Sequence, residues 1–186
     1  MKFENDYIQR IIKGDEQAFK TFMEYHASHL FHYAFGFVKQ KETAEEIVSD
    51  VFFEVWKMRE NLAEVNNLKS WMITATHRKS ISYIRRNVGK MNVPLNEIEQ
   101  FVFDPLQSPD HKIISKEEMD KINAAIQKLP PKCRHVFFLA KIEGLAYVEI
   151  AKILGISVKT INNHIAHALE IISKNLRIFN KNTKSE

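Results

Sequence analysis

The sequence has little of several features that mark other classes of protein. It contains one cysteine, Cys133, among 186 residues, and only five glycines and five prolines. A single cysteine forms neither an internal disulfide nor a cysteine-based zinc site, which favours a reducing, cytoplasmic compartment. No apolar run approaches the roughly 18 residues that cross a bilayer, and the opening residues lack the apolar core of a signal peptide. The sequence therefore predicts no membrane insertion.

Alternating runs of Val, Ile and Thr, which would indicate strands, are also absent. Most segments instead repeat their apolar residues every three or four positions, the period of a helix with one buried face. Hydrophobic residues make up 45% of the chain, and 13 residues are Phe, which is enough to bury two small cores. We therefore predict an all-α fold.

The periodicity predicts four helices in the first half of the chain. A short helix ends at Gly14, and Asp15 caps a long second helix. A third helix is expected over 43–60, followed by a polar loop over 61–67. One of the two asparagines that end this loop can cap a fourth helix, over 68–86. Together these helices form one bundle.

A second helical domain is expected after a segment in which the helical periodicity is lost. Three of the five prolines lie between residues 88 and 114, a segment without sustained periodicity and with the composition of a tether. Beyond it, the spacing of Ser115 and Glu118 is that of a capping box that opens a new helix. We predict two small helical domains, 1–88 and 115–180, joined by a flexible linker over 89–114.

The C-terminal part contains a helix-turn-helix pattern in residues 145–172. A short helix over 148–154 is followed by a turn at Gly155 and by a second helix that Ser157 can cap. Glycine permits the left-handed backbone of such a turn, and Ala151 is small where the two helices cross. This arrangement is typical of domains that read the major groove of DNA.

The second helix of this pattern has one apolar and one polar side. Its apolar residues fall at helical spacing on one side, which we expect to face the core: Val158, Ile161, Ile165, Ala168 and Ile172. The polar residues point largely away from the core: Lys159, Thr160, Asn163, His164 and His167. Residues 119–186 carry 11 basic and five acidic side chains, and no acid lies between Glu149 and Glu170, so a phosphate backbone meets no repulsion there. The alternative is a helical hairpin used for protein contact.

A second basic surface is expected on the helix over 68–86. No acidic residue occurs between Glu64 and Glu97, whereas basic and aromatic side chains alternate there. Arg78, Ser82 and Arg85 share a face at offsets of four and three. Aromatic groups beside cations stack on unpaired bases, so this surface suits melted DNA. The alternative for Trp71 is simple packing in the core.

No constellation of residues indicates an enzyme, a cofactor or a metal site. His26, His29 and His32 are spaced by three, as are His164 and His167, but no carboxylate completes a ligand set beside either group. We interpret these histidines as structural or surface residues. The sequence therefore predicts a protein without a catalytic site.

Three segments resemble those of the extracytoplasmic-function sigma factors, a group within the sigma-70 family. They are AEEIVSDVFFEVWKMRE (44–60), LKSWMITATHRKSISYIRR (68–86) and residues 126–176, which contain the landmarks Leu-Pro, Arg-x-Val-Phe, Glu-Gly-Leu and Leu-Gly-Ile-Ser. Nearly the whole chain is covered in the right order. The resemblance implies a sigma factor that directs RNA polymerase to promoters, with the core polymerase (its clamp and flap), promoter DNA and an anti-sigma factor as partners.

The resemblance also implies roles for particular residues. Polymerase binding falls to Glu46, Ser49, Asp50 and Glu54. Minus-ten recognition falls to Trp71, His77, Arg78, Ser82, Arg85 and Arg86. Minus-thirty-five recognition falls to Ser157, Lys159, Thr160, Asn163, His164 and His167. Family members commonly have Arg-Asn where this chain has His77-Arg78, and Asp where it has Ser82.

The competing hypothesis is a stand-alone helix-turn-helix transcriptional regulator. In that case the N-terminal part would sense a signal or dimerise, and the C-terminal domain would look the same. The acidic helix followed by a basic, aromatic helix argues against it, because a repressor has no need for a surface that melts DNA.

Overall fold

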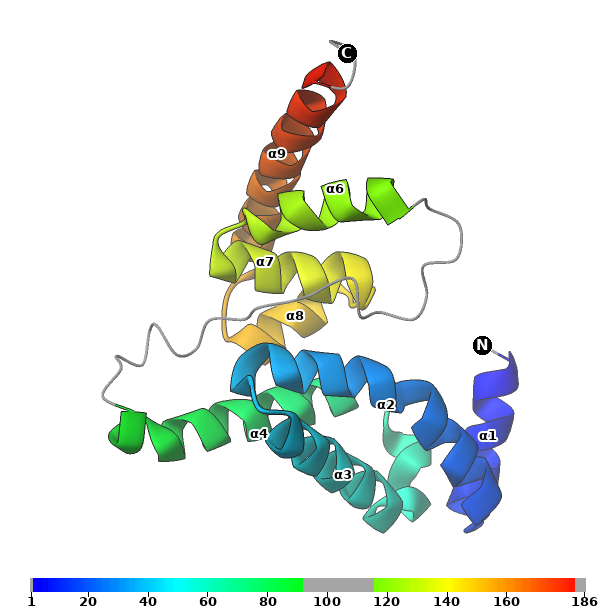
Figure 1. The fold of residues 1–186 in the computed structure, drawn as a ribbon. Helices are drawn as coiled ribbons and strands as arrows, with labels where there is room; N and C mark the ends of the chain where they lie inside the picture. The colour runs from blue at the N-terminus through cyan, green and yellow to red at the C-terminus, as the bar shows by residue number, and fades with distance from the viewer. Residues whose placement is uncertain (1, 92–115, 183–186) are drawn as a thin grey trace. The chain divides into compact units, whose positions relative to one another are not determined.

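The computed structural model describes residues 2–91 and 116–182. The chain divides into two compact units, Met1–Ile98 and Glu99–Glu186. Across the described residues the regular structure is helical, without a strand (Figure 1), which confirms the all-α prediction. No described helix is long and apolar enough to cross a membrane. The predicted domain boundaries at residues 88 and 115 remain predictions, since most of the predicted linker lies outside the described residues.

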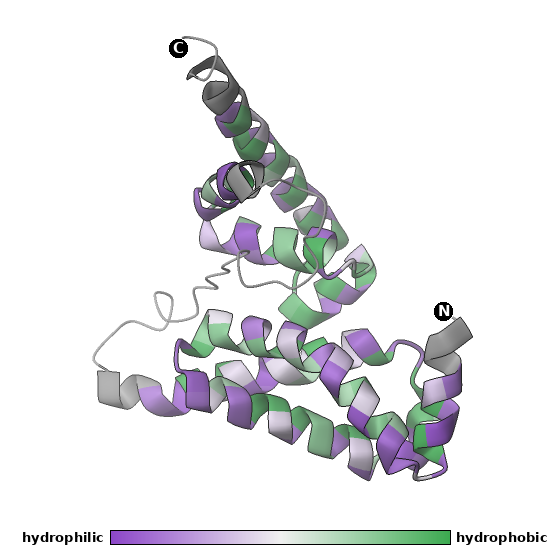
Figure 2. Ribbon diagram, turned by 45° about the vertical axis from the view of Figure 1, so that its right-hand side comes forward, coloured by the Kyte–Doolittle hydropathy of each residue, from purple (hydrophilic) through white to green (hydrophobic). Residues whose placement is uncertain are grey.

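The first unit is a bundle of helices. Its elements are α1 (Lys2–Ile12), α2 (Glu16–Val38), α3 (Lys41–Lys57), the 3₁₀ helix η1 (Arg59–Glu64) and α4 (Leu68–Met91). The helices α2, α3 and α4 each pack against the other two, while α1 packs against α2 and η1 (Figure 1). Figure 2 shows apolar residues gathered on the sides of these helices that face one another.

Capping side chains fix where α2 and α4 begin. The Asp15 carboxylate accepts a hydrogen bond from the Ala18 amide at 2.9 Å, which satisfies one of the open N–H groups of the first turn. The Asn67 side-chain oxygen accepts from the Ser70 amide at 3.0 Å. Both caps were predicted, and the structure selects Asn67 from the two asparagines.

Several element boundaries of the first unit differ from the prediction: α1 ends at Ile12 and α3 begins at Lys41, each two residues before the predicted position. The third helix ends at Lys57 instead of residue 60, and η1 occupies most of the predicted loop over 61–67. Leu62, only 3% exposed, anchors this turn because η1 packs against α1. The helix α4 continues to Met91, beyond the predicted end at residue 86 and into the predicted linker, because no proline interrupts it before Pro94.

The second unit is built around one long helix. Its elements are α6 (Lys116–Gln127), α7 (Pro131–Phe137), a π-helical turn (Phe138–Ile142), α8 (Tyr147–Leu154) and α9 (Val158–Asn182). The helices α6, α7 and α8 all pack against α9. Leu139, Ile150 and Ile161 are fully buried at the centre of this unit. The predicted capping box at Ser115 lies outside the described residues.

The helix that follows Pro130 ends in a π-helical turn. The Glu143 amide donates to the Phe138 carbonyl at 3.0 Å, a hydrogen bond that spans five residues instead of four. Gly144 then adopts φ 68°, in the left-handed region that glycine occupies without strain. The chain therefore leaves the helical conformation at Gly144.

Candidate functional site

The outer face of α3 carries the predicted polymerase-binding residues. Ile47, Val51 and Val55 are buried on the inner face of the helix, and this fixes the opposite face toward solvent. Glu46, Ser49 and Asp50 are exposed, and Glu54 is half-buried at the edge of this face. We call these four residues, which form an anionic surface, the acidic face of α3.

One lysine of α4 holds two carboxylates of the acidic face. The Lys79 ammonium lies 3.0 Å from Asp50 Oδ2 and 2.9 Å from Glu54 Oε1. Burial disfavours the charged form of Lys79, but hydrogen bonds and attraction from Glu54 and Asp50 together outweigh it and raise the pKa of this lysine. The predicted polymerase-binding helix is therefore tied directly to the predicted DNA-binding helix.

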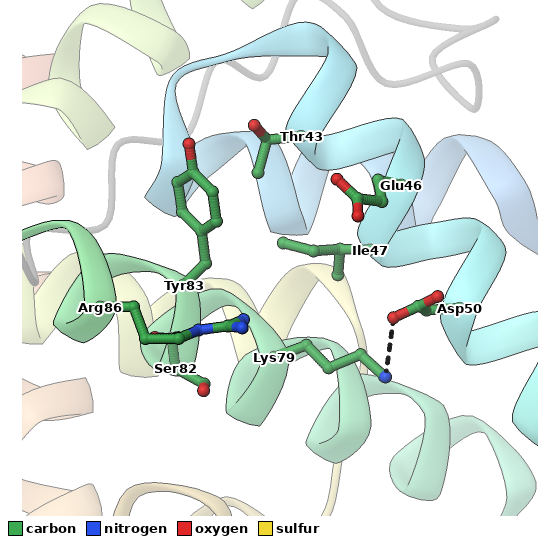
Figure 3. Close-up of a pocket in the computed structure, with 8 residues that line it drawn as sticks. All are labelled: Thr43, Glu46, Ile47, Asp50, Lys79, Ser82, Tyr83 and Arg86. Atoms are coloured by element: carbon green, nitrogen blue, oxygen red, sulfur yellow. Dashed lines mark hydrogen bonds and ion pairs between the residues drawn. The ribbon is translucent and has the colours of Figure 1, made fainter.

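A groove of about 290 Å³ lies between α3 and α4 (Figure 3). It is lined by Thr43, Glu46, Ile47, Asp50, Lys79, Ser82, Tyr83 and Arg86. The Tyr83 hydroxyl lies 2.9 Å from Gln40 Oε1, to which it donates a hydrogen bond across the same pair of helices. Acidic side chains from α3 and basic ones from α4 thus face a common hollow. Residues assigned to two different predicted surfaces are brought together here.

The outer face of α4 presents a cationic surface. Arg78, Ser82, Arg85 and Arg86 are all exposed, whereas Ile84 is buried at 4% exposure. The Arg86 guanidinium donates to the Ser82 carbonyl at 3.4 Å, one turn earlier. The structure therefore groups four of the six residues predicted to bind the minus-ten element, and Trp71 is half-buried near the start of the helix.

His77 lies apart from this cationic surface. Its ring packs against Phe37 and Tyr33 of α2, at centroid distances of 5.3 and 6.4 Å. Desolvation, with smaller contributions from Arg85 and Arg78, lowers the pKa of His77 to about 4, so the ring is neutral at physiological pH. The geometry makes His77 a half-buried residue that packs between α2 and α4.

The helix-turn-helix forms as predicted. Gly155 ends α8 with φ 65°, and the Ile156 amide donates to the Ala151 carbonyl at 3.2 Å. Ser157 then opens α9, where its hydroxyl oxygen accepts from the Thr160 amide at 3.0 Å. Because both caps lie in three consecutive residues, the backbone passes from one helix to the next in a defined turn.

The polar side of α9 is largely open to solvent. Lys159, Asn163 and His167 are exposed, and Thr160 is half-buried with its hydroxyl 2.8 Å from that of Ser157. Inward, the core contacts are made by Ile161, Ile165 and Ala168. Val158, which was predicted to face the core, is instead 38% exposed, because it lies in the first turn, next to the cap.

His164 is half-buried and differs from the other predicted base-reading residues. Its Nδ1 atom lies 3.1 Å from the Cys133 sulfur on α7. Desolvation lowers the pKa of His164, and Lys132 and His167 add to this effect. Burial raises the pKa of the Cys133 thiol, so the contact joins two neutral groups. The Nδ1 edge of the His164 ring therefore contacts another helix of the second unit and is not open to a ligand.

One exposed side chain on α3 was missed by the sequence reasoning. Phe53 is 66% exposed, although the neighbouring Phe52 is buried. The helical period would have found it, since Phe53 follows Glu46 by seven residues and Ser49 by four. Among the described residues, no three His, Cys, Asp or Glu side chains lie close enough together to hold a metal ion.

Two family models match the chain, one in each unit. Residues 22–89 match region 2 of sigma-70, and residues 119–172 match region 4 of sigma-70. These ranges contain α3 and α4 in the first unit and the helix-turn-helix in the second. Such a pairing defines a DNA-binding protein of transcription initiation with two helical parts.

Relatives along the chain are sigma factors. The chain is 25% identical over 178 residues to the ECF RNA polymerase sigma factor SigW of Bacillus subtilis (strain 168), covering 91% of this chain and 95% of SigW. It is 27% identical over 130 residues to the ferric citrate uptake sigma factor FecI of Escherichia coli (strain K12), covering 68% and 72%. The chain belongs to the extracytoplasmic-function group of the sigma-70 family, and it directs RNA polymerase to promoters.

Two solved structures share the fold. The sigma factor RpoE, bound to the anti-sigma factor NepR from Bartonella quintana, matches with a TM-score of 0.60 and 19% identity, over 86% of this chain and 97% of RpoE. CnrH, bound to the cytosolic domain of CnrY, matches with a TM-score of 0.54 and 18% identity, over 92% and 96%.

Proposed function

We propose that this sigma factor divides its work among three helices. The acidic face of α3 binds the core polymerase, α4 contacts and melts the minus-ten element, and α9 reads the minus-thirty-five element. The single observation that carries this assignment is the combination of one anionic helix with two helices that expose cationic or hydrogen-bonding side chains. The sigma factor acts as a non-enzymatic subunit of RNA polymerase in the cytoplasm.

The acidic face suits a docking role because its charges are exposed on a rigid helix. Charge complementarity across an interface steers encounter and fixes register, so we expect a basic surface on the core polymerase opposite Glu46 and Asp50. Asp50 and Glu54 contribute from the edge, where Lys79 holds them in place.

The exposed face of α4 suits single-stranded or melted DNA. Arg78, Arg85 and Arg86 bind phosphates, and Ser82 lies among them as a hydrogen-bonding group. His77 supports this surface from behind by packing on α2. Because Arg78 and Ser82 lie on the exposed face, we expect the departures from the family pattern at these two positions to affect the base preference at the minus-ten element.

The start of α9 suits the major groove. Lys159, Asn163 and His167 address base edges or phosphates. Ser157 caps the helix by accepting from the Thr160 amide, which places both residues beside the phosphate backbone. His164 contributes only the part of its ring that faces away from Cys133.

An anti-sigma factor is a further proposed partner. The related RpoE is bound to the anti-sigma factor NepR, and CnrH to the cytosolic domain of CnrY. We propose that a protein of this kind regulates the present chain by covering the surfaces that bind polymerase.

Reconstitution with core RNA polymerase tests the proposed function. We expect a stoichiometric holoenzyme that starts run-off transcription on genomic templates. A stand-alone regulator would bind DNA but would not join the core enzyme.

Alanine substitutions test the DNA-binding residues. Replacing Lys159 or Asn163 with alanine should change the minus-thirty-five preference. Replacing Arg78 or Arg85 should reduce the permanganate reactivity of melted thymines. Unchanged footprints and reactivity would reject these residue assignments.

A further inference from the structure

Phe53 is a large apolar side chain that the fold leaves in water. It is 66% exposed, whereas Phe52 is only 6% exposed and packs edge-on against the rings of Phe19 and Phe22, at centroid distances of 6.4 Å. Two consecutive phenylalanines therefore point in different directions from α3. One belongs to the core of the first unit, and the other has no place in it.

The exposure of Phe53 is not explained by incomplete packing of α3. The inner face of this helix is fully used, since Val51 and Val55 have no exposed surface. An exposed phenyl ring has no polar group to hydrate. Tyr25 on α2 is comparably exposed, at 74%, but its hydroxyl reaches water. Phe53 is therefore available to a partner without any change in the core.

Polar side chains surround Phe53 on the outside of α3. Ser49 and Asp50 precede it by one turn, Glu46 by two turns, and Lys57 follows it by one turn. All four are exposed. An aromatic residue at the centre of a ring of polar groups is the arrangement of an interface hot spot, in which the rim excludes water and the centre supplies most of the affinity.

We propose that Phe53 is the apolar anchor of the contact between α3 and the core RNA polymerase. It inserts into an apolar pocket on the polymerase that is flanked by basic side chains, which face Glu46 and Asp50. This inference rests on the proposed role of the acidic face. It assigns different kinetic effects to the two kinds of side chain. The carboxylates increase the association rate, and the phenyl ring slows dissociation of the complex.

Binding kinetics with the core polymerase test the proposal. The variants are Phe53→Ser, Phe53→Leu, Glu46→Lys and, as a matched control, Tyr25→Ser, which removes an equally exposed aromatic ring from α2. We expect Phe53→Ser to raise Kd at least tenfold through faster dissociation, to a similar degree at low and high salt. Phe53→Leu should recover most of this loss, and Tyr25→Ser should stay within twofold of the original protein.

The Glu46→Lys variant distinguishes the proposed role of Phe53 from the proposed role of the acidic face as a whole. We expect it to slow association, and to do so most at low salt. If Glu46→Lys weakens binding but Phe53→Ser does not, the anchor proposal is wrong and the docking face stands. If neither variant weakens binding, the assignment of α3 to the polymerase is itself wrong. Equal losses for Phe53→Ser and Tyr25→Ser would also overturn the proposal. Thermal unfolding of each variant checks that the bundle is intact.

Discussion

At the scale of single residues, His77 illustrates how burial changes the role of a polar side chain. In the sequence it stands next to Arg78 in a basic segment, which suggests a position on DNA. In the structure it contacts Phe37 and Tyr33, and its pKa falls to about 4. A neutral imidazole packed between two helices contributes to the stability of the fold.

This environment predicts a pH dependence of stability. Below its ordinary pKa of 6.5, His77 takes up a proton in the unfolded chain, but in the folded chain it does so only near pH 4. The contribution of His77 to stability should therefore fall as the pH drops from about 6.5 toward 4. At pH 5 the loss is about 2 kcal/mol, since each pH unit corresponds to about 1.4 kcal/mol.

Denaturant unfolding at pH 7 and pH 5 measures this effect. The His77→Phe variant, which keeps an apolar ring against α2, should lose less stability on acidification than the original protein, by that same amount. His167→Gln is the matched control, because His167 is exposed. An identical pH dependence in the original protein and in His77→Phe would contradict the assignment.

At the scale of helices, the contact between α3 and α4 is made partly by a single ammonium group. Lys79 is 26% exposed, and it bonds Asp50 and Glu54, which lie one turn apart. Charge reversal at Asp50 would place a cation beside this lysine and disturb the bundle. Glu46, which makes no ion pair among the described residues, is therefore the cleaner position for testing polymerase binding.

Lys79→Met tests the strength of this bridge. Methionine keeps most of the apolar stem but removes the charge, so both carboxylates lose their partner. Because Asp50 and Glu54 are 60% and 44% exposed, solvent screens the pairs, and we expect a loss of only about 1 kcal/mol in unfolding free energy. Lys20→Met, at an exposed position on α2, serves as control. A loss no greater than that of the control would mean that the bridge adds no stability.

The sequence predicted most helices because their apolar spacing, caps and prolines agree with one another. The helix-turn-helix is the clearest case, since Gly155 and Ser157 each supply a local signal that needs no knowledge of the rest of the fold. Failures occurred where tertiary contacts decide. Residues 61–64 have the composition of a polar loop, but Leu62 is buried in η1, which packs against α1. The helix α4 continues past its expected end because no proline interrupts it there.

For the candidate site, the sequence predicted which charged side chains are exposed, but not the contacts that its histidines make. Exposed charges on α3, α4 and α9 follow from helical periodicity once the buried faces are known. The positions of His77 and His164 do not, because their partners Phe37 and Cys133 come from other helices, 40 and 31 residues away in sequence. Phe53 was missed because only the polar residues of its helix were considered for the exposed face.

At the scale of the whole molecule, each unit has a hydrophobic core of its own. Val51, Val55 and Met72 are buried in the first unit, and Leu139 and Ile161 in the second. The family models also match the two units separately. We therefore expect the units to unfold as separate cooperative blocks.

Ile161→Ala tests this independence. Ile161 has no exposed surface, so its truncation should destabilise the second unit by about 2–5 kcal/mol. Hydrogen exchange should then lose protection across α6 to α9, while α2 to α4 keep theirs. The reciprocal variant Val55→Ala should affect only the first unit. Loss of protection in both units from either substitution would show that they fold as one block.

If α3 binds polymerase and α4 binds DNA, as proposed, the bridge made by Lys79 connects the two ligands. A partner that draws Asp50 or Glu54 toward its own cations leaves the ammonium of α4 in need of another anion, and a nucleic-acid phosphate can supply one. The reverse must hold by thermodynamic reciprocity: an anion that engages Lys79 releases the carboxylates. Occupancy of one helix by polymerase and of its neighbour by DNA would then favour each other, without any change in backbone shape.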